Sequence, residues 1–174
     1  IFPGANKKIT PNKIEKFMDR YEHSIEIMLI QNEIPQESIK KAIEQARKSG
    51  KTIVYDPAPK ENTAVEYLHG IDFLTPNETE FEYLYTLCGG AERISIEKKA
   101  LWFKKHVQVK NLILKQGSKG SLFVGEDGKI IVTPAFKVDS IDSTAAGDIF
   151  NAAFAVKYGL SKNIEESLVY ASAA

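Results

Sequence analysis

The sequence has little of several features, and each shortage excludes a class of protein. Its single cysteine, Cys88, rules out an internal disulfide and is typical of a reducing cytoplasm. No apolar run approaches the roughly 20 residues that cross a bilayer. Lys and Arg (23) balance Asp and Glu (23), so no net charge attracts nucleic acid. We therefore expect a cytoplasmic protein that binds neither membranes nor nucleic acid.

Two nucleotide-binding fingerprints are missing as well. The patterns G-x-G-x-x-G and G-x-x-x-x-G-K-[ST] do not occur, which disfavours dinucleotide-binding and P-loop proteins. The histidines, His23, His69 and His106, have no metal-ligand spacing. Residues 1–6 lack the basic leader and the apolar core of a signal peptide. Since the sequence also lacks an initiator Met and stops within a helical pattern, we expect it to be a piece of a longer protein.

What the sequence does contain is an alternation of short apolar strands and amphipathic helices. Asp127-Gly128, between two of the strands, is a strong hairpin signal. The pattern predicts a single α/β domain over residues 1–174, a three-layer αβα sandwich with a mostly parallel sheet and a late β-hairpin. Strands are expected at residues 25–30, 52–55, 71–74, 112–114, 121–124 and 129–133, and helices from residues 10, 35, 77, 95, 145 and 164, with a shorter helical stretch at 64–68.

Polar residues follow four of the expected strands. They occur at residues 31–33, at Asp56, at residues 75–80 and at residues 115–120. In open parallel sheets, ligands bind beyond the carboxyl ends of the strands, so these groups could share one binding edge. Strands also commonly end in ordinary polar turns, and that alternative stays open for this pattern alone.

The run STAAGD at residues 143–148 is more informative. Small residues let a backbone approach a ligand closely, and they stand here where a long apolar helix begins. The first turn of a helix offers N–H groups without intrahelical partners and the positive end of a dipole, which together suit a phosphoryl group. Asp148 would lie within that turn and could accept the proton of an attacking hydroxyl. The alternative is that Asp148 only stabilises the start of the helix.

Residues 142–148, DSTAAGD, resemble the signature of the ribokinase family of sugar kinases, also called the phosphofructokinase-B group. Ser143 replaces the usual Thr and keeps its hydroxyl. The resemblance implies that Asp148 is the catalytic base, and that the backbone N–H groups of Ala145, Ala146 and Gly147 form an anion hole. It also implies the α/β fold of this family, with ATP and a small sugar as substrates.

Further segments resemble the same family. Residues 75–80, TPNETE, match its Asn-x-x-Glu element, and residues 116–120, QGSKG, resemble its nucleotide-contact turn. The resemblance implies that Glu80 acts on Mg²⁺ through water, which fits the preference of Mg²⁺ for oxygen ligands and retained waters. The residues that it implies for nucleotide binding are Asn77, Lys115, Gly117, Ser118 and Gly120.

The resemblance extends to the sugar and to a monovalent cation. Residues 31–35, QNEIP, resemble a family segment whose Glu contacts the sugar, so Glu33 is expected to bind a sugar hydroxyl together with Asp148. A solvated loop residue is the alternative for Glu33. The resemblance places K⁺ beside the anion hole, with Asp142 and the carbonyl of Thr144 among its ligands.

The expected reaction is phosphoryl transfer from MgATP to a pentose hydroxyl, with D-ribose giving ribose 5-phosphate. Two alternatives remain: a kinase of the same fold for another sugar or a nucleoside, and a non-catalytic regulator that binds a sugar or a nucleotide. The sequence shows no counterpart of the sugar-binding amino-terminal part of the family, of its lid strands or of its carboxyl-terminal adenine loop. It is therefore expected to be the central and C-terminal part of a sugar kinase, whose full-length form could be a homodimer.

Overall fold

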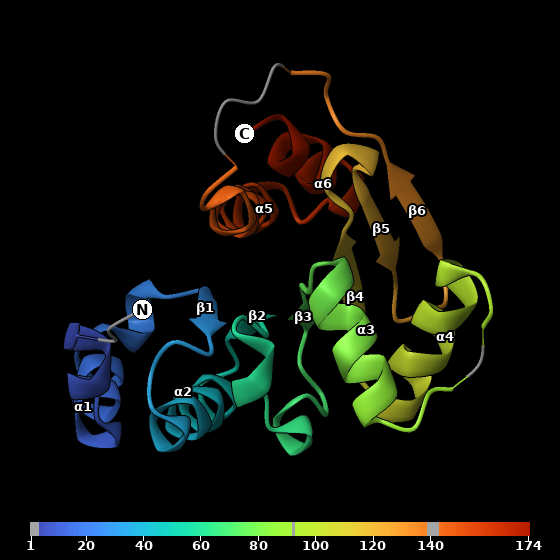
Figure 1. Cartoon of the computed structure of the whole chain (residues 1–174). Helices are drawn as coiled ribbons and strands as arrows, with labels where there is room; N and C mark the ends of the chain where they lie inside the picture. The colour runs from blue at the N-terminus through green and yellow to red at the C-terminus, as the bar shows by residue number, and fades with distance from the viewer. Residues whose placement is uncertain (1–3, 92, 139–142) are drawn as a thin grey trace.

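A computed structural model describes residues 4–91, 93–138 and 143–174. Strands and helices alternate along most of the chain (Figure 1). The strands are β1 (Ile27–Gln31), β2 (Thr52–Asp56), β3 (Phe73–Leu74), β4 (Asn111–Lys115), β5 (Ser121–Val124) and β6 (Ile130–Thr133). The α-helices are α1 (Pro11–Tyr21), α2 (Gln36–Lys48), α3 (Glu78–Leu87), α4 (Ile96–Val107), α5 (Ala146–Ser161) and α6 (Ile164–Ala173).

The strands form one six-stranded sheet in the order β1-β2-β3-β4-β5-β6. Neighbours from β1 to β4 are parallel, whereas β5 pairs antiparallel with β4, and β6 pairs antiparallel with β5. The β5–β6 hairpin turns at Asp127-Gly128, where Gly128 has a φ of 83° that suits glycine. The predicted mostly parallel sheet with a late hairpin is confirmed.

Helices cover both faces of the sheet, so the predicted three layers are confirmed (Figure 1). Helices α1 to α4 lie on one face, and their core includes Ile39, Phe81 and Phe103. Helices α5 and α6 lie on the other, where Phe154 and Leu168 pack on the sheet. Each fully buried side chain of this size stabilises the fold by about 1.5–3 kcal/mol. None of the helices in the described part of the chain is long and apolar enough to cross a membrane.

Besides β6, which starts at Ile130, one residue later than expected, three predicted elements are shorter in the structure. The helical stretch at 64–68 is a single 3₁₀ turn, Val65–Tyr67. The strand expected at 71–74 comprises only Phe73–Leu74, because the N–H of Ile71 donates to the carbonyl of Leu68 in the preceding turn. The strand expected at 25–30 starts at Ile27, since a 3₁₀ turn follows α1. Local turns that follow a helix or precede a strand therefore account for all three differences.

Candidate active site

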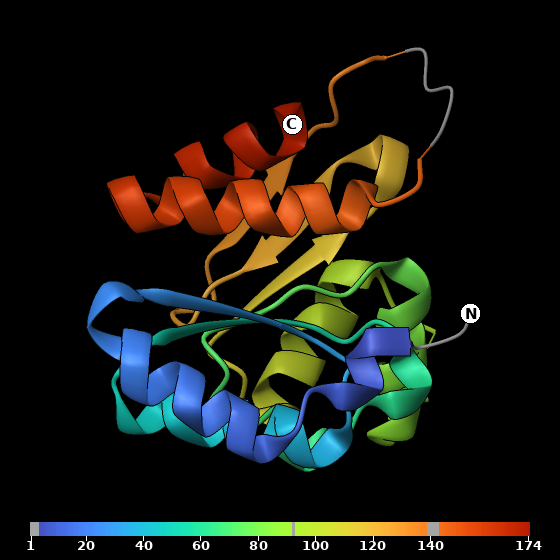
Figure 2. The same ribbon diagram turned by 90° about the vertical axis from the view of Figure 1, so that its left-hand side faces the viewer.

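The carboxyl ends of the parallel strands meet the start of α5 at one edge of the sheet. Gln31, the last residue of β1, is in register with Asp56, the last residue of β2. Lys115 ends β4, and an isolated bridge joins it to Asn77 just after β3. Figure 2 shows α5 running across the sheet above β1. The polar residues that follow the predicted strands thus come together at a single edge.

Asp148 lies in the first turn of α5, is exposed and points to this edge. The side-chain amide of Gln31 donates a hydrogen bond from Nε2 to Oδ1 of Asp148. A neutral amide donor fixes the orientation of the carboxylate without adding a charge beside it. The position suits a general base, which must reach the proton that it abstracts.

A buried ion pair lies beside the start of α5. Nζ of Lys115 is 2.9 Å from Oδ2 of Asp56, and the two side chains are 12% and 5% exposed. Asn151 of α5 donates from Nδ2 to the same oxygen. A Cβ on Gly147 would stand 3.2 Å from Nζ of Lys115, so the ammonium group lies against the first turn of α5. Its charge and the positive end of the helix dipole therefore act at the same place.

Burial raises the pKa of Asp56, although the charge of Lys115 and hydrogen bonds from Lys115 and Asn151 oppose the effect. The negative charge of Asp148, at the same edge of the sheet, adds to this rise in the pKa of Asp56. Oδ1 of Asp56 and Oδ1 of Asn151 are buried acceptors that have no hydrogen-bond partner among the described residues. Such acceptors call for donors, such as ordered water molecules.

Asn77 and Glu80 form a capping box at the start of α3. Oδ1 of Asn77 accepts from the N–H of Glu80 at 2.9 Å, and Oε2 of Glu80 accepts from the N–H of Asn77 at 2.8 Å. Glu80 is buried, and burial raises its pKa even though the N–H of Asn77 opposes this. The helix cap alone explains why this residue pair occurs here. The nucleotide and magnesium roles of the pair stay predictions.

The oxygen-rich edge fits a magnesium ion held mainly by water and phosphates. No group of three or more His, Cys, Asp or Glu side chains among residues 4–91, 93–138 and 143–174 is placed to hold a metal ion directly. Mg²⁺ keeps several waters and commonly takes only one or two carboxylates beside substrate phosphates. Glu80 and the unpaired Oδ1 of Asp56 are acceptors that such waters could donate to.

Replacing Glu80 by Gln separates its structural role from its predicted metal role. A Gln can still accept from the N–H of Asn77, so the capping box survives. Because the pKa of Glu80 is raised, ionisation costs folding free energy as the pH rises through that pKa. We therefore expect E80Q to be as stable as the parent chain below the ordinary pKa that Glu has in an unfolded chain, and more stable than the parent above the raised pKa of the folded state. Urea unfolding at several pH values would measure this difference.

The same variant should bind ATP roughly 10-fold more weakly when Mg²⁺ is present, as expected for loss of an outer-sphere partner. Glu82→Gln is the matched control, because Glu82 is exposed on the same helix and pairs with Lys99 at 2.7 Å. Titration of MgATP would compare the two variants. Equal affinities for E80Q and E82Q would contradict a role for Glu80 near the metal.

The turn between β4 and β5 contains two glycines with different constraints. Gly117 starts a 3₁₀ turn with a φ of 54°, and a Cβ on it would meet nothing within 4 Å. Gly120 has a φ of 96°, and its Cβ would stand 1.9 Å from the carbonyl oxygen of Thr133. Close packing against β6 is thus sufficient reason for a glycine at position 120. Ser118 is exposed between them.

Replacing each glycine by Ala should have unequal effects. Gly120→Ala must move the backbone of β6 as well as strain its own, so the free energy of unfolding should fall by about 3 kcal/mol. Gly117→Ala should lose only about 1 kcal/mol, the cost of a left-handed non-glycine residue. Urea unfolding of both variants tests this, and equal losses would show that contact with Thr133 is not what requires Gly120.

For the residues predicted to bind the sugar and K⁺, the structure gives fewer contacts. Glu33 is exposed and accepts from Nδ2 of Asn6 at 3.3 Å, in a hollow that Gln31 also lines. Thr144 is exposed, and Asp142 lies outside the described residues, so the potassium site stays a prediction.

Among the residues predicted to form the anion hole, Ala145 has a φ of 61°, and the N–H of Ala146 donates to the carbonyl of Ser143 at 3.2 Å. Gly147 is half-buried beside Lys115.

Sequence reasoning assigned no role to three residues of this site, Gln31, Asp56 and Asn151. The first two stand within the polar groups that follow strands, but nothing local shows which partners they meet. Asn151 is a polar residue within an apolar helix, three positions after Asp148, and this spacing places it on a neighbouring part of the same face. A buried Asn in such a helix is the signal that could have identified it.

Comparisons with known proteins concern the family and the fold of this chain. The family model described as pfkB family carbohydrate kinase matches residues 1–174. A ribokinase of Lactococcus lactis subsp. lactis is 32% identical over 168 residues, which are 96% of this chain and 51% of that protein. The crystal structure of ribokinase from Thermotoga maritima matches with a TM-score of 0.87 and 40% identity, covering 100% of this chain and 56% of that chain.

A structure of Arabidopsis thaliana ribokinase complexed with ribose and ATP matches with a TM-score of 0.81 and 31% identity. The match covers 100% of this chain and 56% of that chain. This chain therefore spans about half the length of the relatives that it matches.

Proposed function

The chain belongs to the pfkB family of carbohydrate kinases, and from this premise we propose that it carries the phosphoryl-transfer site of a kinase acting on MgATP and a sugar. The observation that supports this most is the position of Asp148. It stands in the first turn of α5, beside the ammonium group of Lys115, at the edge where the parallel strands end. The α/β domain formed by residues 1–174 then supplies the central and C-terminal part of that enzyme.

The chemistry follows from these groups. The carboxylate of Asp148 accepts the proton of a sugar hydroxyl, and Gln31 keeps that carboxylate in place. The hydroxyl oxygen forms a bond to the γ-phosphorus while the bond from this phosphorus to the bridging oxygen of ADP breaks. The first-turn N–H groups of α5 and Lys115 hold the negative charge of the group in transfer. Positioning and electrostatics thus account for the acceleration.

The ion pair keeps Lys115 ready for this role. Asp56 and Asn151 fix the ammonium group from the buried side, so it does not fold away from the start of α5. When bound with the nucleotide, Mg²⁺ neutralises phosphate charge, and Glu80 and Asp56 would accept from its waters. Asn77, Gly117 and the exposed Ser118 border the same edge and would contact the nucleotide.

D-ribose, giving ribose 5-phosphate, is the proposed acceptor. Support comes from the relatives described as ribokinases, one of them complexed with ribose and ATP. Glu33 would bind a sugar hydroxyl, since it lines the same hollow as Gln31, which holds Asp148. K⁺ activation through Asp142 and Thr144, and a homodimer of the full-length protein, are further proposals that rest on the family resemblance.

A product assay tests the proposed function. A protein of the full length typical of this family that contains this 174-residue sequence (the family-length protein) would be incubated with MgATP and a panel of ribose, deoxyribose, fructose and a nucleoside. We expect ADP to form fastest with ribose. A different preferred sugar would leave the kinase chemistry standing and correct the acceptor. Saturable binding of a sugar or MgATP without any phosphorylated product would instead identify a non-catalytic regulator.

A further inference from the structure

The turn that follows β1 contains a buried asparagine. Asn32 is only 1% exposed, although Gln31 before it is partly exposed and Glu33 after it is exposed. Gln31 holds Asp148, and Glu33 is the residue proposed to bind the sugar. Asparagine is common in turns because it tolerates their geometry, but turn residues normally face solvent. A buried side-chain amide at this place calls for partners within the protein.

Both ends of the Asn32 side chain are hydrogen-bonded. Nδ2 of Asn32 donates to Oγ1 of Thr63 at 2.7 Å and to the carbonyl oxygen of Pro59 at 3.2 Å. Oδ1 of Asn32 accepts from the phenol group of Tyr55. A side-chain amide has two N–H bonds to donate and one oxygen that accepts, and each of them has a partner here. The side chain therefore has a single favourable orientation.

The main chain of Asn32 is held to the same segment. Its N–H donates to the carbonyl oxygen of Ala58 at 2.9 Å. Its carbonyl oxygen accepts from Nδ2 of Asn62 at 3.3 Å. All of these partners stand between residues 55 and 63, at the end of β2 and in the segment after it. Asn32 thus fixes the turn after β1 to one continuous piece of the chain.

Tyr55 acts only as a donor in this network. Its side chain is fully buried, and burial raises the pKa of the phenol, although the hydrogen bond to Asn32 opposes the rise. The phenol therefore keeps its proton at physiological pH and donates to an oxygen. This requirement places Oδ1 of Asn32, and not Nδ2, beside Tyr55. Thr63 is held as well, because its hydroxyl donates to the carbonyl oxygen of Pro57 at 3.4 Å.

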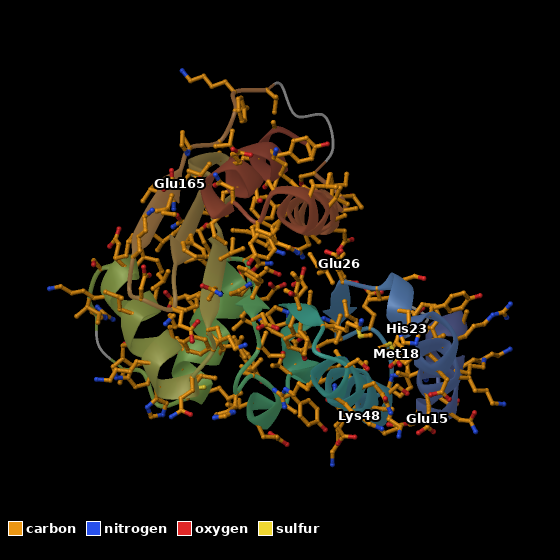
Figure 3. All side chains as sticks on the ribbon, turned by 180° about the vertical axis from the view of Figure 1, so that it is seen from behind. Glu15, Met18, His23, Glu26, Lys48 and Glu165 are labelled. Atoms are coloured by element: carbon orange, nitrogen blue, oxygen red, sulfur yellow. The ribbon has the colours of Figure 1, made fainter. Side chains whose placement is uncertain are left out.

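The other end of β1 is held differently. Glu26 precedes the strand and is labelled in Figure 3. Its carboxylate is 3.2 Å from Nζ of Lys162, which follows α5, and both side chains are largely exposed. Exposed ion pairs are screened by water and constrain a chain only weakly. The end of β1 that contains Gln31 is therefore the one that buried hydrogen bonds fix, and Glu26 offers a control on the same strand.

Precise placement matters at this end because of the groups beside Asn32. The carboxylate of Asp148 must reach the proton of a sugar hydroxyl, and Gln31 orients that carboxylate. A displacement of about 1 Å in a catalytic group can lower a rate by roughly 10²-fold. Buried networks whose members are all hydrogen-bonded are rigid, so they are suited to hold such groups. The rigidity of this turn therefore affects both the base and the sugar contact of Glu33.

We propose that Asn32 is a positioning residue for phosphoryl transfer. By fixing the turn after β1, it holds Gln31 against Asp148 and keeps Glu33 within reach of the sugar. Its side-chain partners act through it, and none of these residues contacts a substrate. The inference rests on the proposed function. Affinity for MgATP does not depend on Asn32, because the residues proposed to bind the nucleotide follow β3 and β4.

Tyr55→Phe and Thr63→Val test this role in the family-length protein, because each removes one partner of the Asn32 amide. Tyr55 and Asp56 point to opposite faces of β2, so Y55F leaves the pair of Asp56 with Lys115 intact. For the sugar that the parent protein phosphorylates fastest, we expect KM to rise at least roughly 10-fold in each variant, with the KM for MgATP unchanged. Steady-state kinetics with each substrate varied in turn would measure both constants.

Three control variants should keep the parent KM for the sugar. Thr63→Ser retains the hydroxyl that accepts from Asn32. Glu26→Gln removes the exposed ion pair at the other end of β1. Tyr85→Phe removes the hydroxyl of another buried tyrosine, which packs against Trp102 of α4.

The possible results separate this inference from the proposed function. A merely structural role would lower kcat through loss of folded enzyme and leave both KM values unchanged, and that result would overturn the inference alone. Parent kinetics in both Y55F and T63V, or an equal rise in the two KM values, would do the same. A parent protein that forms no phosphorylated sugar would instead overturn the proposed function, and this inference with it.

Discussion

Asp148→Asn should lower the kcat of the family-length kinase by roughly 10²–10⁴-fold, the usual contribution of a positioned general base. Asn keeps the shape of the side chain and an oxygen that accepts from Gln31, but it does not take up the proton of the sugar hydroxyl. Affinity for MgATP should change little, because the ammonium of Lys115 and the first turn of α5 remain. Steady-state kinetics together with nucleotide titration would measure both quantities.

Asp19→Asn is the control for this variant, since Asp19 is an exposed carboxylate on α1. Its kcat should equal that of the parent enzyme. If D148N retained a kcat close to that of D19N, Asp148 would be no more than a residue that stabilises the start of α5. The family fold would stand, and the assignment of the base would be wrong.

Lys115→Met should lower the free energy of unfolding by about 3–5 kcal/mol near neutral pH, as breaking a buried ion pair generally does. The loss arises because Asp56 then keeps its negative charge in a buried site with only Asn151 beside it. Burial already raises the pKa of Asp56, and removal of the Lys115 charge raises it further. Urea unfolding followed by circular dichroism would measure the loss.

The pH dependence of that loss has a definite sign. Protonation removes the uncompensated charge of Asp56, so the deficit of K115M should shrink as the pH falls through the raised pKa of Asp56. The double variant Asp56→Asn with Lys115→Met should recover much of the stability at neutral pH. Lys119→Met is the exposed control, because Lys119 pairs with Glu78 at 2.8 Å on the surface and should contribute less than ~1 kcal/mol. Equal losses for K115M and K119M would contradict the account.

Much of the fold could be predicted because its signals are local. Thr10-Pro11 starts α1, Asn77 caps α3, and Asp127-Gly128 turns the hairpin, each through the geometry of neighbouring residues. The order of strands and the antiparallel pairing of β4 with β5 depend on contacts between distant segments. No local pattern encodes those contacts.

The residues of the candidate site also divide into those with a local sequence signal and those that meet only through contacts between distant segments. The place of Asp148 and Gly147 in the first turn of a helix could be predicted, because a small-residue run before an apolar helix is a local signal. The pairing of Lys115 with Asp56 could not, since the residues are 59 positions apart and meet only through the sheet. Gln31 reaches Asp148 from 117 positions away in the same manner. The resemblance alone predicts that Lys115 contacts the nucleotide. The structure adds the ion pair with Asp56, which holds the ammonium group of Lys115 in position.

The account depends on a transferring phosphoryl group being held at the first turn of α5, next to a carboxylate that takes a proton. A crystal structure of the family-length enzyme with ADP, aluminium fluoride and ribose tests this most directly, because the fluoride mimics the group in transfer. We expect the aluminium fluoride to contact the N–H of Gly147 and the ammonium of Lys115, with the Asp148 carboxylate about 3 Å from a ribose hydroxyl. Aluminium fluoride bound away from α5, or an Asp148 that contacts no sugar hydroxyl, would contradict it.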